Sequence, residues 1–161
     1  MFCSLVLAVL DTLVWRFEIA FMATLFEIEG NLKYELIDKI ADGRMGAMFR
    51  AYQIGSEGLA KEVAIKVMHA QYAHDATFQR RFEREAALGL KLEHAGIVRV
   101  LDLVVDAGML ALVMELVEGR PLSELIGQVT GPIPWARAAP MFEQLVSAVD
   151  YAHSQGVVHR D

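Results

Sequence analysis

Three consecutive segments with strand-like apolar patterns constrain the fold of this chain more than any other feature. The first two, residues 34–41 and 47–52, are separated by residues 42–46, where Asp42 and Gly43 favour a turn. In the third, residues 63–67, apolar side chains alternate as they do in a strand with two different faces. The patterns predict three antiparallel strands that are neighbours in one sheet.

The period then changes to that of a helix and back again. Residues 76–92 are expected to form a helix, because their apolar residues recur every four positions and oppositely charged pairs support them. Two β-branched and aliphatic runs, at 97–105 and 110–114, flank a turn at 106–108 and predict a hairpin. The expected sheet therefore has five strands.

The last third of the chain reads as helical. A short helix is expected over residues 121–126 and a longer one from about 134 to 154, with Gly156 after its end. The longer helix carries an apolar stripe of Met141, Leu145, Ala148 and Ala152. The predicted fold class is α+β, with an antiparallel sheet and one helix followed by further helices.

The first 26 residues are mostly apolar but are interrupted by Asp11, Arg16 and Glu18. A membrane span is disfavoured, because a charge near the bilayer centre costs roughly 2.5–3.5 kcal/mol. A secretory signal is a weaker reading, since no basic residue precedes the apolar stretch. Two further readings are an added amphipathic helix and a chain that naturally starts at Met22, and we favour the latter.

Composition excludes several classes of partner and cofactor. The chain has 15 Lys and Arg against 21 Asp and Glu, a net charge of −6, so it lacks the basic surface that nucleic acids or anionic membranes require. Its single cysteine, Cys3, cannot form an intramolecular disulfide, which indicates a reducing, cytoplasmic compartment. No metal-ligand spacing is found among its five histidines, so no metal site is predicted.

Three features could carry chemistry. Gly43 and Gly46 lie in the first hairpin, where bare backbone N–H groups could approach a phosphate, although such glycines more often serve only the turn. A strand follows them, which excludes the dinucleotide-binding and Walker A loops. Lys66 occupies a polar position in an apolar strand; it either faces solvent or needs a counter-charge, for which Glu85 is the candidate. The third feature is the tripeptide 159–161, His-Arg-Asp.

In their order and spacing these features resemble the front part of a protein kinase catalytic domain, closest to bacterial members of the eukaryotic-like Ser/Thr family. The resemblance covers about residues 32–161, leaves residues 1–31 as an N-terminal extension, and implies an ATP-binding lobe and hinge over 32–117 and the start of a helical lobe over 118–161. It rests on the glycine loop, Val63-Ala64-Ile65-Lys66, Glu85, His94-Ala95-Gly96-Ile97-Val98, Leu112-Val113-Met114-Glu115 and Val157-Val158-His159-Arg160-Asp161.

The resemblance implies a role for each matching residue. Lys66 would bind the α- and β-phosphates of ATP, held by Glu85, and Asp161 would accept the proton of the substrate hydroxyl. Arg160 resembles the arginine that engages a phosphorylated activation loop. Met114 resembles the gatekeeper residue at the back of the adenine pocket. The implied ATP-binding residues are Ile40, Ala41, Asp42, Gly43, Arg44, Met45, Gly46, Ala47, Met48, Ala64, Lys66, Met114, Glu115 and Val117.

The implied cofactors are ATP and Mg²⁺, and the implied partner is a protein substrate. In the family an Asn five residues after the catalytic Asp and the Asp of a later Asp-Phe-Gly hold the Mg²⁺ ions, and residues 1–161 contain neither. We therefore expect these 161 residues alone to be inactive in transfer and poorly stable, since the stripe of the last helix lacks partners. The alternative is a non-catalytic relic that binds nucleotide or a partner.

Overall fold

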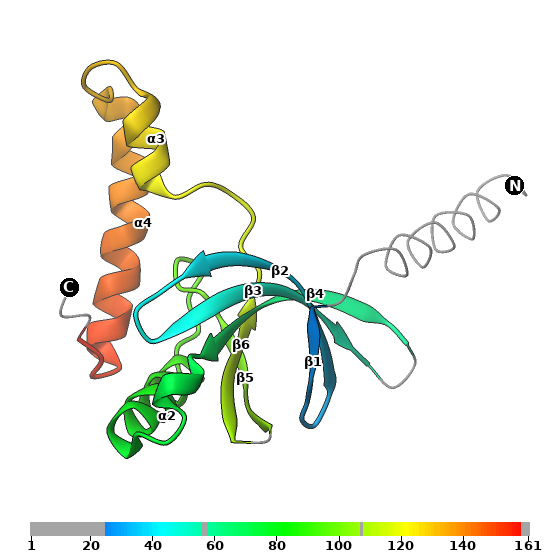
Figure 1. Ribbon diagram of the computed structural model, residues 1–161. Coiled ribbons are helices and arrows are strands. Elements are labelled where there is room, and N and C mark those ends of the chain that lie inside the picture. Colours follow the sequence, from blue (N-terminus) through cyan, green and yellow to red (C-terminus); the bar gives the residue numbers. More distant parts are fainter. Residues whose placement is uncertain (1–24, 56–57, 107, 159–161) are drawn as a thin grey trace, which may run out of the picture.

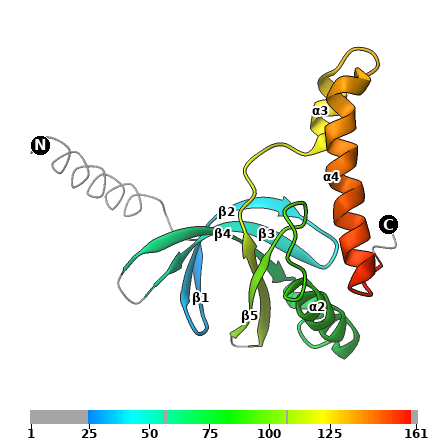
Figure 2. The same cartoon turned by 180° about the vertical axis from the view of Figure 1, so that it is seen from behind.

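The computed structural model describes residues 25–55, 58–106 and 108–158. The strands form one antiparallel sheet in the order β1-β2-β3-β4-β6-β5, and α2 lies against this sheet. The helices α3 and α4 lie to one side of it, beside the end where the chain turns from β2 to β3 (Figures 1 and 2). The strands are β1 Phe26–Glu29, β2 Lys33–Asp42, β3 Gly46–Ile54, β4 Ala60–Met68, β5 Val100–Asp106 and β6 Met109–Glu115. The helical elements are the 3₁₀ turn η1 Ala70–Tyr72, α2 Ala76–Gly89, α3 Leu122–Gln128 and α4 Trp135–Ser154.

The expected α+β architecture is confirmed, but the sheet has six strands rather than five. The additional strand, β1, lies within residues 1–31, which we expected to be an N-terminal extension, and it pairs with β2. Its alternating pattern is only four residues long and follows a mostly apolar segment, so the period of two does not stand out in the sequence. The boundary at residue 32 stays a prediction, as do the readings of the first 24 residues, which lie outside the described part of the chain.

The two edge strands of the sheet, β1 and β5, approach each other and curl the sheet toward a barrel (Figure 1). The N–H of Glu29 donates to Asp106 Oδ2 over 3.2 Å, and Gly30 lies so close to Val104 that an added Cβ would come within 2.8 Å of it. Inside the curl, the Tyr34 hydroxyl donates to Asp102 Oδ2 at 3.3 Å. Burial raises the pKa of the Tyr34 phenol.

The sheet has two buried faces. The concave face holds the larger apolar core, made of Ile28, Tyr34, Leu36, Ala51, Val63, Ile65, Val67, Val104, Ala111 and Val113. The opposite face receives Phe82 and Ala86 of α2, which pack against Met68, Leu110 and Leu112. The helix α2 begins where the Asp75 carboxylate accepts the N–H of Thr77 at 2.8 Å, a standard N-cap.

We expect Ile28→Ala to lower the free energy of unfolding by about 3 kcal/mol, because Ile28 is only 1% exposed and its loss leaves a cavity in the concave core. Leu59→Ala is the matched control, since Leu59 is 73% exposed. Urea denaturation followed by circular dichroism measures both. Equal, small effects of the two substitutions would show that β1 is not part of the folded core.

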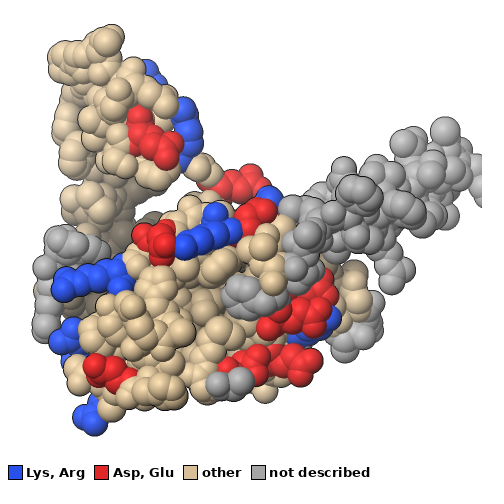
Figure 3. All heavy atoms as spheres, viewed as in Figure 1, with Lys and Arg blue, Asp and Glu red and all other residues tan. Residues whose placement is uncertain are grey.

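The long helix α4 buries little of its surface. Ala148 is the one buried residue of α4, and it lies against Gly96 of the loop that precedes β5. Leu145 of the predicted stripe is 57% exposed. The space-filling view shows uncharged surface over much of this end of the molecule (Figure 3). None of the helices in the described ranges is long and apolar enough to cross a membrane.

Two predicted elements extend three residues beyond the observed ones. β5 begins at Val100 rather than at residue 97, because residues 95–97 form a turn closed by the N–H of Ile97 to the carbonyl of His94. α2 ends at Gly89, three residues early, where an added Cβ would come within 2.4 Å of Val100. Close packing of this helix end on β5 thus replaces the last predicted turn.

Candidate functional site

An ion pair between the sheet and α2 is the centre of the candidate site. Lys66 Nζ lies 2.6 Å from Glu85 Oε1 and 5.7 Å from the centre of the Phe82 ring. Phe82 and Ala86 anchor α2 on the sheet, and this brings the intervening Glu85 to the lysine. The Lys66 side chain is 23% exposed and that of Glu85 47%, so the pair remains open to solvent and to a ligand.

The strand register places three further predicted residues on the same face of the sheet as Lys66. Lys66 is directly opposite Met48 of β3. Ala64, two residues before Lys66 on β4, is opposite Met114 of β6. Directly opposed residues, and residues two apart on one strand, share a face. The side chain of Ala47 is buried on the other face, which leaves only its backbone for a ligand.

The glycine loop closes the hairpin between β2 and β3. The N–H of Gly43 donates to the carbonyl of Gly46 at 2.9 Å, so the turn is tight. Gly46 lies against the backbone of β4, and an added Cβ would stand 2.3 Å from the Val67 carbonyl oxygen. At the end of β2, Asp42 pairs with Lys39, and this hydrogen bond lowers the pKa of the Asp42 carboxyl.

A pocket forms where β2 passes the segment that follows β6. It brings together three predicted residues, Ile40, Ala41 and Val117. The sequence reasoning missed the other lining residues, which are Leu116, Glu118, Gly119, Arg120 and Pro121. No local pattern marks them, because they line the pocket only through the crossing of two segments that are far apart in the sequence.

Glu115 differs from the other predicted nucleotide contacts. Its N–H donates to the Arg99 carbonyl at 3.0 Å, and its carboxylate accepts the Arg99 N–H at 2.8 Å. Both groups are therefore engaged by the loop before β5, and a backbone contact of Glu115 with a base stays a prediction. Arg160 and Asp161 lie outside the described residues, so their roles stay predictions.

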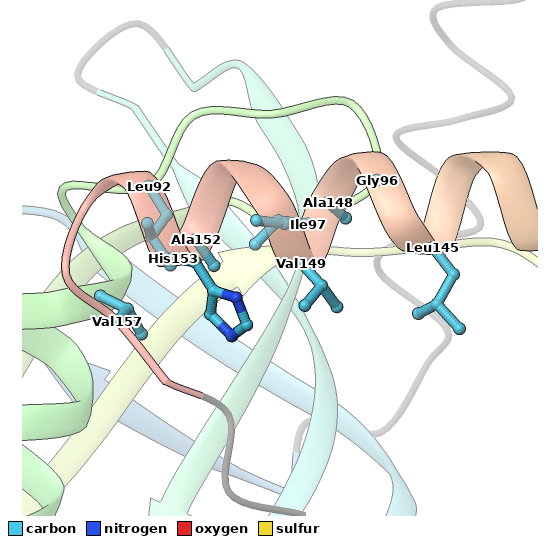
Figure 4. A pocket seen from close by; sticks show the side chains of 9 residues that line it. All are labelled: Leu92, Gly96, Ile97, Leu145, Ala148, Val149, Ala152, His153 and Val157. Atoms are coloured by element: carbon cyan, nitrogen blue, oxygen red, sulfur yellow. The ribbon is translucent and has the colours of Figure 1, made fainter.

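A second pocket lies apart from this site, between α4 and the loop that precedes β5 (Figure 4). Its walls are almost entirely apolar, and Leu145, Val149 and His153 lie along one side of the helix. The loop is tied to α4 by His94, which stacks on Tyr151 with ring centres 5.3 Å apart. Across the described ranges, no group of three or more His, Cys, Asp or Glu side chains is arranged to hold a metal ion.

The first of these two sites is suited to a phosphorylated ligand. A lysine held by a carboxylate provides a fixed positive charge, and a tight glycine turn on the neighbouring hairpin leaves backbone N–H groups accessible. The pocket beside Ile40 and Ala41, directly before that turn on β2, suits a flat aromatic group. A nucleotide has both kinds of group, a charged phosphate chain and a flat base.

Comparison with known proteins agrees with this geometry. The family described as "Protein kinase domain" matches residues 34–161. The serine/threonine-protein kinase PrkC of Bacillus subtilis is 40% identical over 129 residues, which cover 80% of this chain and 19% of PrkC. PkaA, a serine/threonine-protein kinase of Streptomyces coelicolor, is 39% identical over 137 residues, covering 80% of this chain and 25% of PkaA.

A solved structure shares the fold. The crystal structure of the Mycobacterium tuberculosis PknI kinase domain superimposes with a TM-score of 0.66 at 26% sequence identity, covering 86% of this chain and 54% of that one. The chain thus spans about a fifth to a quarter of these curated relatives and about half of the solved domain.

Proposed function

Since the chain belongs to the protein kinase domain family, we propose that it supplies the ATP-binding half of a Ser/Thr protein kinase. In this proposal the described residues bind ATP, and the complete domain transfers the γ-phosphoryl group to a Ser or Thr hydroxyl of a protein substrate. The compartment proposed is the cytoplasm, which is reducing and supplies ATP.

The observation that carries the proposal is the 2.6 Å contact between Lys66 and Glu85. Phosphoryl transfer depends mainly on positioning and charge neutralisation, and in the family a lysine–glutamate pair of this kind must be formed before the phosphates are held correctly. Here α2 already lies where the pair is closed. Ala64, Met48 and Met114 lie on the same face of the sheet as Lys66, and in this proposal they contact the base.

The remaining roles follow from the family. Asp161 would accept the proton of the attacking hydroxyl, and Arg160 would contact a phosphorylated activation loop. Mg²⁺ would neutralise the charge that develops on the transferred phosphoryl group, but no residue within 1–161 corresponds to the Asn and Asp that hold it in the family. We therefore expect a polypeptide of residues 1–161 alone to bind nucleotide without transferring phosphate.

Titration of the 161-residue chain with a fluorescent ATP analogue tests the proposal. We expect saturable binding that ATP and ADP displace, because in this proposal the pocket beside Val117 takes the base and the Lys66 site takes the phosphates. A parallel assay with radiolabelled ATP and a generic protein substrate should show no transfer. Absence of any displaceable binding by folded protein would refute the ATP-binding assignment, and measurable transfer would refute the expected inactivity.

A further inference from the structure

His69, which neither the sequence reasoning nor the proposed function assigns, lies immediately after β4 and contacts the glycine loop at three points. Its N–H donates to the Met45 carbonyl at 3.1 Å, and its Nε2 lies 3.0 Å from the Gly43 carbonyl oxygen and 3.3 Å from Asp42 Oδ1. A carbonyl oxygen can only accept, so Nε2 carries the hydrogen in this arrangement.

These contacts come from opposite ends of one turn. Gly43 and Met45 flank the tip residue Arg44, and both of their carbonyls are taken by the same histidine. In the backbone described by the structure, the N–H groups of Arg44 and Met45 donate to no carbonyl. With the carbonyls held on one side, these N–H groups remain free to meet an anion.

The register of the sheet explains why this histidine reaches the loop. Gly46 is opposite Met68, the last residue of β4, so the next residue lies directly beside the turn, as Figure 1 shows for the end of β4. The His69 side chain is partly buried there, which favours a fixed position over free rotation. The contact therefore belongs to the folded sheet and does not depend on a bound ligand.

We propose that His69 is a positioning residue that pre-organises the glycine loop for the phosphates of a nucleotide. This inference rests on the proposed function, because it concerns the same site. His69 touches no part of the nucleotide in this proposal. Its backbone N–H holds the Met45 carbonyl, as any non-proline residue at this position could, and its imidazole holds the Gly43 carbonyl, which is the contact specific to histidine. Pre-organisation raises affinity by removing part of the ordering cost that binding would otherwise carry.

The test compares two variants. His69→Phe keeps an aromatic ring but loses the ring N–H, and His69→Gln has a side-chain amide that can still donate to the Gly43 carbonyl. Affinities for ATP and for adenosine are measured on the full 161-residue chain. We expect His69→Phe to weaken ATP binding about three- to tenfold, the effect of one net hydrogen bond, and to leave adenosine binding unchanged. His69→Gln should recover most of the loss, and His74→Phe, at an exposed histidine, should have no effect.

Amide hydrogen exchange at Gly43, whose N–H donates to the Gly46 carbonyl within the turn, is measured by NMR without nucleotide and tests the same contact independently. Exchange should accelerate in His69→Phe and not in His74→Phe. Equal losses for ATP and adenosine, tighter ATP binding, or unchanged exchange would each overturn the proposal. If the wild-type chain binds neither ATP nor adenosine, the proposed function fails, and the exchange result still decides whether His69 orders the loop.

Discussion

Replacing Gly46 by alanine is expected to lower the free energy of unfolding by about 2–3 kcal/mol, the range of an overpacked interior. The new Cβ would stand 2.3 Å from the Val67 carbonyl oxygen and 3.2 Å from the Met68 Cα. Both are backbone atoms of the neighbouring strand, so no side chain can turn away to relieve the contact. The two strands must separate at the end that carries the glycine loop.

The same substitution should also weaken ATP binding, because the separation moves Gly46 away from β4 and with it the loop that His69 contacts. Gly127→Ala is the matched control, since nothing lies within 4 Å of its added Cβ and the residue is inside the helix α3. In a helix this change is expected to stabilise by up to about 1 kcal/mol. Thermal or urea unfolding separates the two variants, and equal behaviour would contradict the steric account.

Gly46 also shows what the sequence could and could not reveal. The spacing of Gly43 and Gly46 correctly marked a hairpin, and the lack of side chains was interpreted as access for phosphate. The structure adds a second reason, close approach of β4, and Gly46 has no positive φ that would explain the glycine otherwise. A contact of this kind depends on strand register, which no residue pattern within the hairpin encodes.

An element can be predicted from the sequence when it is long enough for its buried residues to repeat with a clear period. Alternate residues of β2, β3 and β4 enter the concave core, and α2 buries one stripe of residues, so their apolar residues repeat with the period of the element. β1 has four residues, too few for its alternation to stand out from the apolar run before it. Its place is fixed by pairing with β2 and contact with β5, both of which are tertiary.

The residues of the candidate site also differ in whether the local sequence could predict them. Lys66 was visible as a charge in an apolar strand and Glu85 as its counter-charge on the next helix, and the structure brings them together. His69 was not visible, because a polar residue after a strand usually faces solvent. The pairing of β3 with β4 turns it into a contact of the glycine loop. Local chemistry predicted the ion pair, whereas sheet geometry determined the support around it.

Lys66→Met is the substitution with the largest expected effect on ligand binding. Methionine keeps a side chain of similar length and removes the charge that would meet the phosphates. Charge-assisted hydrogen bonds contribute roughly 1.5–3 kcal/mol, so ATP affinity should fall about 10- to 100-fold. Adenosine, which has no phosphate, should bind as before.

The fold should tolerate this change, which makes the result interpretable. The ion pair is partly exposed, and such pairs contribute about 1 kcal/mol or less to stability. Lys61→Met is the matched control, because Lys61 is an exposed lysine near the other end of the same strand. Calorimetric titration of the three proteins, with unfolding curves for each, measures both effects. ATP affinity that is unchanged in folded Lys66→Met, or equally reduced in Lys61→Met, would remove Lys66 from the proposed site and with it the main support for nucleotide binding there.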